Sequence, residues 1–122
     1  MQDESVKSIF PFVPAEDFEL ATQFYKDLGF TCPQDEEGVR VFRKGDFGFL
    51  LQDHYVEDWA SNFMMNMHVD DAQGWHDFIT EAKLIEKYPG TSLSKPALED
   101  WGMIVMHLVD PTGILWHITQ RP

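Results

Sequence analysis

Apolar residues recur along this chain with two spacings, one typical of helices and the other of strands. The clearest helical pattern lies between Asp17, which can cap a helix, and Gly29, which can end one. Its apolar positions are Leu20, Ala21, Phe24, Tyr25 and Leu28. Runs of bulky residues separated by glycine-containing turns predict strands around this helix, at residues 8–13, 39–43 and 47–52.

The second half of the chain repeats this order of elements. A strand is predicted over residues 63–69, and Asp70 or Asp71 can cap the helix that follows it. The apolar stripe of that helix is Trp75, Phe78, Ile79, Ala82 and Ile85. Further strands are predicted at one short place within residues 89–100, then at 103–109 and 114–119. Each half therefore has a strand, a helix and about three strands, which predicts two stacked modules sharing one core.

This order of elements indicates an α+β fold with a largely antiparallel sheet. With 122 residues the chain is long enough for one domain with one real core. We expect a single domain over residues 1–122, built of modules at about residues 8–54 and 62–120.

Strand alternation assigns the side chains of the second module to faces. One face of each strand is entirely apolar and is expected to pack against helices. The opposite faces carry Asn66, His68, His107 and His117 and are expected to look toward a cavity or solvent. An apolar lining with few polar groups is typical of a small-molecule pocket. A single strand histidine is more often an ordinary, partly exposed residue, but the set together favours a pocket if the modules form a concave sheet.

Charge narrows the range of partners. Nine Lys and Arg residues stand against 21 Asp and Glu, which gives a formal net charge of −12. Nucleic acid is not expected as a partner, because phosphate binding needs clustered basic residues. An acidic surface would steer cationic ligands toward the protein, although acidity also serves simply to keep a protein in solution.

Other sequence features concern location and redox chemistry. The apolar runs are shorter than the roughly 20 residues of a membrane span, and the N-terminus lacks the pattern of a secretory signal. We therefore expect a cytoplasmic protein with no membrane partner. Cys32 is the only cysteine, which excludes an internal disulfide and a thiolate-rich zinc site.

Segments near both ends of the chain resemble a known superfamily. Residues 12–17 (FVPAED) and 24–30 (FYKDLGF) are similar to the first module of the glyoxalase/bleomycin-resistance/dioxygenase proteins, the vicinal oxygen chelate superfamily. Trp101-Gly102 and residues 110–117 (DPTGILWH) are similar to its closing module. The resemblance extends from about residue 9 to residue 120. It implies two βαβββ modules that form cupped, mixed, largely antiparallel sheets with helices on their outer faces.

The resemblance also bears on metal chemistry. Enzymes of this superfamily hold one divalent metal on side chains from the first and last strand of each module, and the matching positions are Phe10, Leu50, Met64 and His117. Only His117 is a competent ligand among these, so we expect no metal, no cofactor and no catalytic residues. Gln52 would share the face of Leu50. An alternative is a lyase, isomerase or transferase with a different metal site around His117, such as zinc held by His68, His107 and His117.

The metal-free branch of the superfamily implies a different activity. Bleomycin-resistance proteins are homodimers that sequester a cationic drug in grooves between subunits, and Trp101-Gly102 and His117 match them. We therefore predict a homodimeric small-molecule-binding protein of this antibiotic-resistance type. It would sequester or sense a ligand expected to be cationic and aromatic, in a cavity at or near the dimer interface. Phe10, Phe12, Trp59 and Trp101 are the candidates for stacking on that ligand.

The expected ligand-binding residues come from both modules. They are Phe10, Phe12, Leu50, Gln52, Trp59, Met64, Asn66, His68, Trp101, His107 and His117. A third possibility remains beside the binding protein and the enzyme: a structural or partner-binding module whose cavity is filled by Phe10, Leu50 and Met64.

Overall fold

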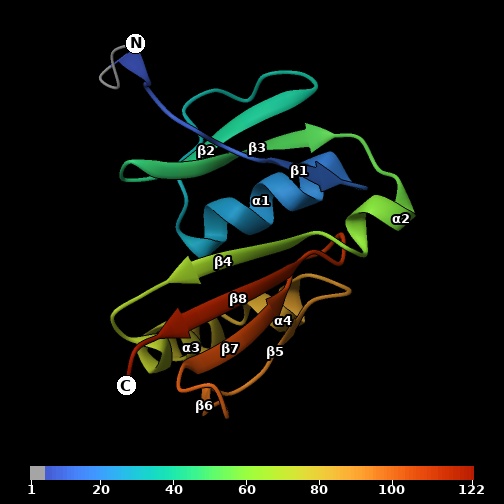
Figure 1. Ribbon diagram of the computed structural model, residues 1–122. Coiled ribbons are helices and arrows are strands. Elements are labelled where there is room, and N and C mark those ends of the chain that lie inside the picture. Colours follow the sequence, from blue (N-terminus) through green and yellow to red (C-terminus); the bar gives the residue numbers. More distant parts are fainter. Residues whose placement is uncertain (1–4) are drawn as a thin grey trace. The chain divides into compact units, whose positions relative to one another are not determined.

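The computed structural model describes residues 5–122, whose contacts divide them into two compact units. The first unit ends at His54, and the second runs from Tyr55 to Pro122. Each unit has its own β-sheet (Figure 1). Within the described part of the chain, every helix is too short or too polar to cross a membrane.

The first unit is a three-stranded sheet with one long helix. Its elements are β1 (Phe12–Ala15), α1 (Phe18–Leu28), β2 (Val39–Lys44) and β3 (Phe47–Asp53). The strand order is β1-β3-β2, with β1 parallel and β2 antiparallel to β3. Thr31 pairs with Arg43 beyond β2, through backbone hydrogen bonds of 2.8 and 2.9 Å.

The first strand begins later than its sequence pattern predicts. The run 8–13 was expected to be the strand with Pro14 at its end, whereas β1 covers Phe12–Ala15 and includes Pro14. Leu50 N–H donates to the backbone carbonyl of Pro11. In parallel pairing, the backbone N–H and C=O groups of Val13 and Ala15 therefore point toward β3, and the backbone nitrogen of Pro14 points away from it. A proline is tolerated there because β1 is an edge strand and this nitrogen needs no partner.

Helix α1 forms as its spacing predicts. The Asp17 carboxylate accepts a hydrogen bond from Leu20 N–H at 3.1 Å, and Gly29 closes the helix with a φ of 111°, which favours glycine. The helix covers one face of the sheet with an aromatic cluster around Tyr25. The ring of Tyr25 lies 4.8–6.1 Å, between ring centres, from those of Phe24, Phe30, Phe42 and Phe49.

A buried arginine joins the helix to the sheet. Arg40 lies on the helix-covered face of β2 and is only 3% exposed. Its guanidinium forms a bidentate ion pair with Glu19, with both N–O distances 2.9 Å, and donates to the Thr22 hydroxyl and to the Glu36 carbonyl. It also lies 4.4 Å from the centre of the Phe18 ring. A buried charge is tolerated here because its donors are paired.

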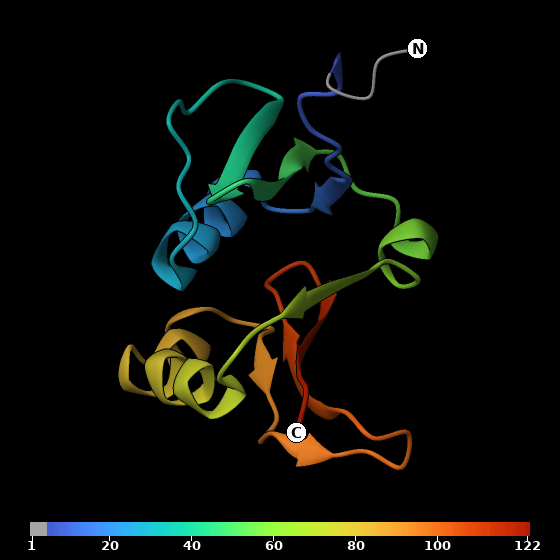
Figure 2. The same cartoon turned by 60° about the vertical axis from the view of Figure 1, so that its left-hand side comes forward.

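The second unit has a larger sheet and more short elements. They are α2 (Glu57–Ala60), β4 (Met64–His68), α3 (Ala72–Glu81), α4 (Leu84–Lys87), β5 (Ser92–Leu93), β6 (Ala97–Leu98), β7 (Ile104–Val109) and β8 (Leu115–Gln120). The strand order is β4-β8-β7-β5, and β6 also pairs with β7. Strand β4 is parallel to β8, and the other pairs are antiparallel. Both α3 and α4 lie against one side of this sheet (Figures 1 and 2).

The helical region of this unit differs from its sequence pattern. The Asp71 side chain caps α3 as expected, but the helix stops near Glu81 and Lys83 takes a left-handed φ of 56°. The chain then restarts as α4 in a new direction. Leu84 and Tyr88 are therefore buried, whereas Ala82 and Phe78, both expected in the apolar stripe, are exposed.

Two further details of the second unit were not predicted. The one short strand expected within residues 89–100 is two strands, β5 and β6, each two residues long. Both pair with β7: β5 lies along its C-terminal end and β6 along its N-terminal end. The segment before β4 contains the short helix α2, which has no side-chain cap.

The two units repeat one topology. In each, the first strand is parallel to the last, and the last pairs with the strand before it as an antiparallel hairpin. The α+β class, with mixed sheets and a repeated strand–helix–strands unit, is confirmed.

Replacing Arg40 by Ala is expected to lower the free energy of unfolding by about 2–3 kcal/mol, because hydrogen bonds to a charged group are lost. Urea denaturation followed by circular dichroism measures this. The matched control is Arg43→Ala, on the same strand with an exposed side chain, which should cost less than about 1 kcal/mol. Equal losses in the two variants would contradict the role of Arg40.

The same ion pair predicts a pH dependence. The hydrogen bond from Arg40 lowers the pKa of Glu19 below its usual value of 4.5. Because the folded-state pKa is the lower one, this pair stabilises the protein above about pH 4.5 and the contribution is lost as pH falls through the folded-state value. Glu19→Gln should flatten the acid limb of the stability–pH curve, and should have no such effect when Arg40 is already Ala. An acid limb unchanged by Glu19→Gln would refute this.

Candidate ligand-binding faces

The sheet of the first unit has one face that α1 does not cover, which we call the first open face. Strand register places Phe12, Leu50 and Val41 side by side across β1, β3 and β2. Pro14, Gln52 and Val39 form the next row. The side chain of Phe12 is 52% exposed, whereas its neighbour Val13 on the other face is fully buried. This face is therefore apolar, accessible and contains one amide.

Two features border the first open face. Phe10 precedes β1, and its ring centre lies 4.9 Å from the guanidinium carbon of Arg43. A hollow of about 230 Å³ lies beside β2, and its lining residues are Pro33, Gln34, Glu36, Val39 and Val41. Val39 and Val41 belong to both the hollow and the open face, so the accessible apolar surface continues past the edge of the sheet.

The sheet of the second unit also has a face opposite its helices, which we call the second open face. Register places three rows across β4, β8 and β7. The rows are Met64–Leu115–Val109, Asn66–His117–His107 and His68–Thr119–Val105. Met64, Asn66 and His68 are exposed, whereas Met65 and Met67 on the other face are half-buried. The alternation expected from the sequence is thus present.

The polar groups of the second open face lie in two of its three rows, the one that begins with Asn66 and the one that begins with His68. The rings of His107 and His117 are in direct contact, with centres 5.0 Å apart and planes at 70°. The Thr119 hydroxyl donates to Asn66 Oδ1 at 3.4 Å and lies 3.1 Å from His68 Nδ1. Asn66, His68 and Thr119 therefore form one network beside the histidine pair.

Two local contacts fix the hairpin that carries the histidine pair. Ser94 Oγ accepts a hydrogen bond from the backbone N–H of His107 at 2.9 Å. The buried carboxylate of Asp110 accepts three backbone N–H bonds in the β7–β8 turn, from Thr112, Gly113 and Ile114, at 2.8–2.9 Å. The turn is thus held by a side chain rather than by backbone bonds alone.

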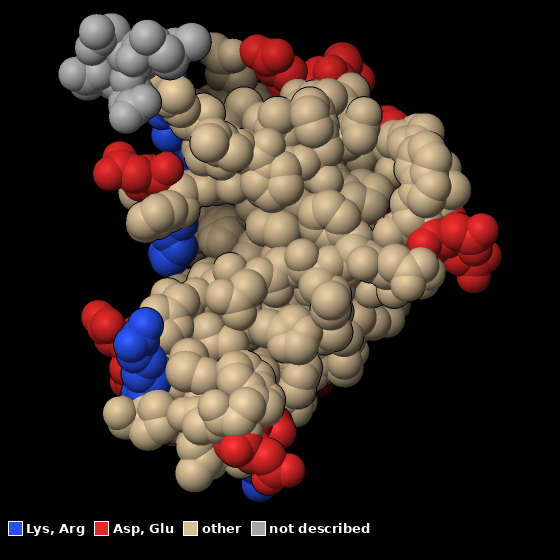
Figure 3. All heavy atoms as spheres, in the orientation of Figure 1, with Lys and Arg blue, Asp and Glu red and all other residues tan. Residues whose placement is uncertain are grey.

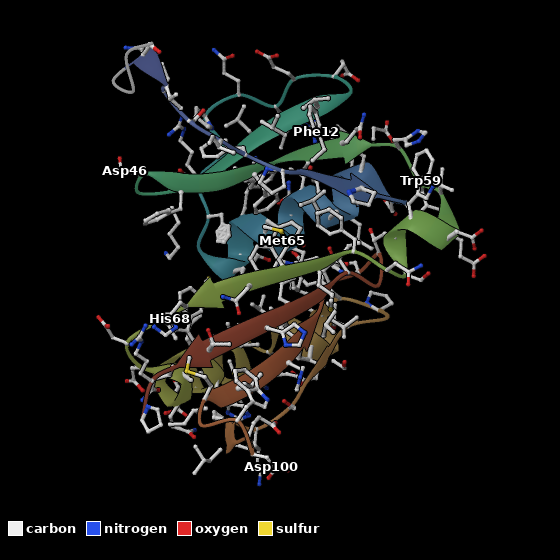
Figure 4. All side chains as sticks on the ribbon, viewed as in Figure 1. Phe12, Asp46, Trp59, Met65, His68 and Asp100 are labelled. Carbon is white, nitrogen blue, oxygen red and sulfur yellow. The ribbon has the colours of Figure 1, made fainter. Side chains whose placement is uncertain are left out.

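The structure brings together some of the predicted site residues. Phe12, Leu50 and Gln52 share the first open face, with Phe10 at its border. Met64, Asn66, His68, His107 and His117 share the second open face. Trp59 lies on α2, outside the strands, with 67% of its surface exposed (Figure 4). Trp101 lies in the turn before β7, also outside the strands, with 66% of its surface exposed.

Sequence reasoning missed three groups at these faces. Thr119 connects His68 to Asn66, and its place on the His117 face could have been read from strand alternation. Nothing in the sequence indicated that Ser94 would contact the His107 backbone or that Arg43 would lie against Phe10. Their positions depend on strand register and on a bend in the chain, which the sequence does not display.

The metal site that the resemblance implies does not fit the residues present. Phe10, Leu50 and Met64 carry no oxygen or nitrogen donor, so His117 is the only competent ligand at the four positions. The zinc site of three histidines is also not formed. Within residues 5–122, no group of three or more His, Cys, Asp or Glu side chains is placed to hold a metal ion. His68 turns instead to Thr119.

Cys32 is not set up as a nucleophile. Burial raises the pKa of its thiol, and its Sγ lies 3.3 Å from the Gln34 carbonyl oxygen. A reactive cysteine needs surroundings that favour the thiolate.

Charged groups border the second open face rather than covering it. In the space-filling view, the surface over β7 and β8 consists of uncharged residues, and Asp and Glu side chains gather toward its margins (Figure 3). In this view the surface over β7 and β8 therefore carries little charge of its own.

Comparisons with known proteins agree with this fold. No family model matches the chain. The bleomycin resistance protein of Klebsiella pneumoniae is 28% identical over 113 residues, which is 91% of this chain and 90% of that protein. The crystal structure of a bleomycin-binding protein complexed with bleomycin matches with a TM-score of 0.80 and 26% identity, over 96% of this chain and 100% of the other.

Two other solved structures extend the comparison. A bleomycin resistance determinant encoded on a transposon has a TM-score of 0.77 and 25% identity, over 95% of this chain and 98% of that chain. Lactoylglutathione lyase from Agrobacterium tumefaciens has a TM-score of 0.69 and 15% identity, over 94% of each chain, which shows a shared fold alone.

Fold, repeat and sequence similarity together define a class. Its fold and sequence are similar to those of the glyoxalase/bleomycin-resistance/dioxygenase superfamily. Within that superfamily it is similar to the bleomycin-resistance-type binding proteins.

Replacing Asp110 by Ala is expected to lower the free energy of unfolding by about 2–3 kcal/mol, because three hydrogen bonds to the carboxylate are lost and only Gly113 N–H keeps another acceptor, the backbone carbonyl of residue 110. The matched control is Asp100→Ala, an exposed aspartate in the turn before β7, which should change stability by less than about 0.5 kcal/mol. Thermal and urea unfolding measure both. Equal stability of the two variants would show that the carboxylate does not hold the turn.

Proposed function

We propose that this protein is a metal-independent small-molecule-binding protein of the bleomycin-resistance type. It sequesters a cationic, aromatic ligand and so lowers the concentration of free ligand. The observation that carries this proposal is the similarity over nearly the whole chain to a bleomycin resistance protein and to a bleomycin-binding protein solved with bleomycin.

The two open faces support binding rather than packing alone. Each face has apolar side chains with a few polar groups, which is the usual composition of a small-molecule site. The first face offers Phe12 beside Leu50 and the amide of Gln52. The second offers Met64 with the Asn66, His68 and Thr119 network. Met64 is flexible enough to adapt to a ligand's shape.

Exposed aromatic rings supply the stacking surfaces that a planar ligand needs. Phe12, Trp59 and Trp101 are each more than half exposed, which is unusual for large apolar side chains. The net charge of −12 favours a cationic ligand through long-range attraction. Both properties match the chemistry of a cationic heteroaromatic drug.

A homodimer is part of this proposal. Strands β1 and β4 lie at edges of their sheets, and each pairs with a single strand among the described residues. Two copies could cover these edges and enclose the open faces between them. A cytoplasmic location is proposed with it, where such a protein would meet an imported drug.

Metal-free bleomycin is the first ligand to test, by isothermal titration calorimetry in EDTA-containing buffer. We expect saturable binding, and a weakening of about tenfold for Trp101→Ala and Phe12→Ala, because each loses a stacking contact of about 1.4 kcal/mol. The matched control is Phe47→Ala, which removes an aromatic ring that is 79% exposed at the end of β3 and outside the open faces.

Three outcomes would count against the proposal. Absence of binding would overturn the ligand class, and binding that requires a divalent metal on the protein would overturn metal independence. An equal effect of Phe47→Ala would show that the open faces are not the site. Expression in a bleomycin-sensitive bacterium gives an independent readout, since sequestration should raise the inhibitory concentration of the drug.

A further inference from the structure

The second open face holds two imidazoles in direct contact. His107 and His117 are Cα partners on the neighbouring antiparallel strands β7 and β8. Their ring centres are 5.0 Å apart with planes at 70°. Both side chains are partly exposed, so the pair is open to solutes.

The ring nitrogens of this pair are available to a ligand. Among the described residues, neither ring takes part in a hydrogen bond or ion pair, since the contacts of His107 with Ser94 involve the His107 backbone. His68 differs, because its Nδ1 is taken up by the Thr119 hydroxyl. Asn66 lies on the other side of His117 in the same row, and its side chain carries a carbonyl oxygen that can bind a metal ion.

The separation of the two rings suits a shared metal ion. Metal–nitrogen bonds of about 2.0–2.1 Å place an ion roughly 3.2 Å from the centre of each coordinating imidazole. At a near-tetrahedral angle the two ring centres are then about 5 Å apart, which is the separation found between His107 and His117. Coordination would require one nitrogen of each ring to be turned toward the ion.

We propose that His107 and His117 form a binding site for a divalent transition-metal ion. Imidazole ligands favour Cu²⁺, Ni²⁺ and Zn²⁺ over Mg²⁺ and Ca²⁺, and the general order of affinity places Cu²⁺ first. Water completes the coordination, because the described residues contain no third His, Cys, Asp or Glu placed to join the pair. The ion is therefore accessible to an incoming donor atom.

The scaffold and the charge of the chain both support such a site. The Asp110 carboxylate holds the turn between the two strands, so the histidines stay opposite each other without a metal. A net charge of −12 raises the local concentration of cations. This site differs from the four positions of the superfamily enzymes, of which only His117 is a competent ligand. It does not rest on the proposed binding of bleomycin.

Titration of the purified protein with CuCl₂, NiCl₂ and ZnCl₂, followed by calorimetry, tests the site. We expect one ion per chain, with Cu²⁺ bound most tightly. His107→Ala and His117→Ala should each weaken Cu²⁺ binding at least tenfold, and the double variant should abolish it. The matched control is His76→Ala on α3, which should bind like the unchanged protein. Circular dichroism confirms that each variant is folded.

Electron paramagnetic resonance of the Cu²⁺-loaded protein gives a second readout. The unchanged protein should show hyperfine coupling to two imidazole nitrogens, and each single variant to one. Lack of Cu²⁺ binding, or binding that survives in the double variant, would overturn the site. Loss of binding in His76→Ala would do the same. Bleomycin binding measured in EDTA is a separate quantity, so failure of one proposal leaves the other standing.

Discussion

Each sheet of this protein has helices against one face only, and most of its other properties follow from that asymmetry. Strand alternation sends every second side chain to the helix-covered face, which holds Phe49 and Leu51 in the first unit and Trp116 and Ile118 in the second. The remaining side chains have no helix to cover them. They can therefore be selected for contact with something other than the core, which is why aromatic, amide and imidazole groups accumulate there.

Alternation is also the part of the structure that the sequence predicts best. The grouping of Asn66 and His68 on one face of β4, and of His107 and His117 on the matching faces of β7 and β8, follows from a period of two residues. The sequence does not contain the register, which depends on how the hairpin turn closes. Direct contact between His107 and His117 therefore became visible only in the structure. The network through Thr119 became visible for the same reason.

The errors in the predicted elements have local physical causes. Pro14 was read as the end of a strand, but the outward nitrogen of an edge strand needs no hydrogen bond. The apolar stripe of α3 was extended past Glu81, but the left-handed backbone at Lys83 redirects the chain and buries Leu84 instead. Arg40 would be expected at the surface from its charge alone. Its burial depends on Glu19 and Thr22, which lie near it only after α1 has docked.

Pro14 has a consequence for how the chain meets other chains. Along the free side of β1, the backbone offers a hydrogen-bond donor only at every second residue, and at Pro14 that donor is missing. A strand from another molecule would therefore lack one backbone hydrogen bond at this position. The proline that shifts the apparent start of the strand thus also interrupts the row of donors along this edge, and a partner covering it would have to do so mainly through side chains.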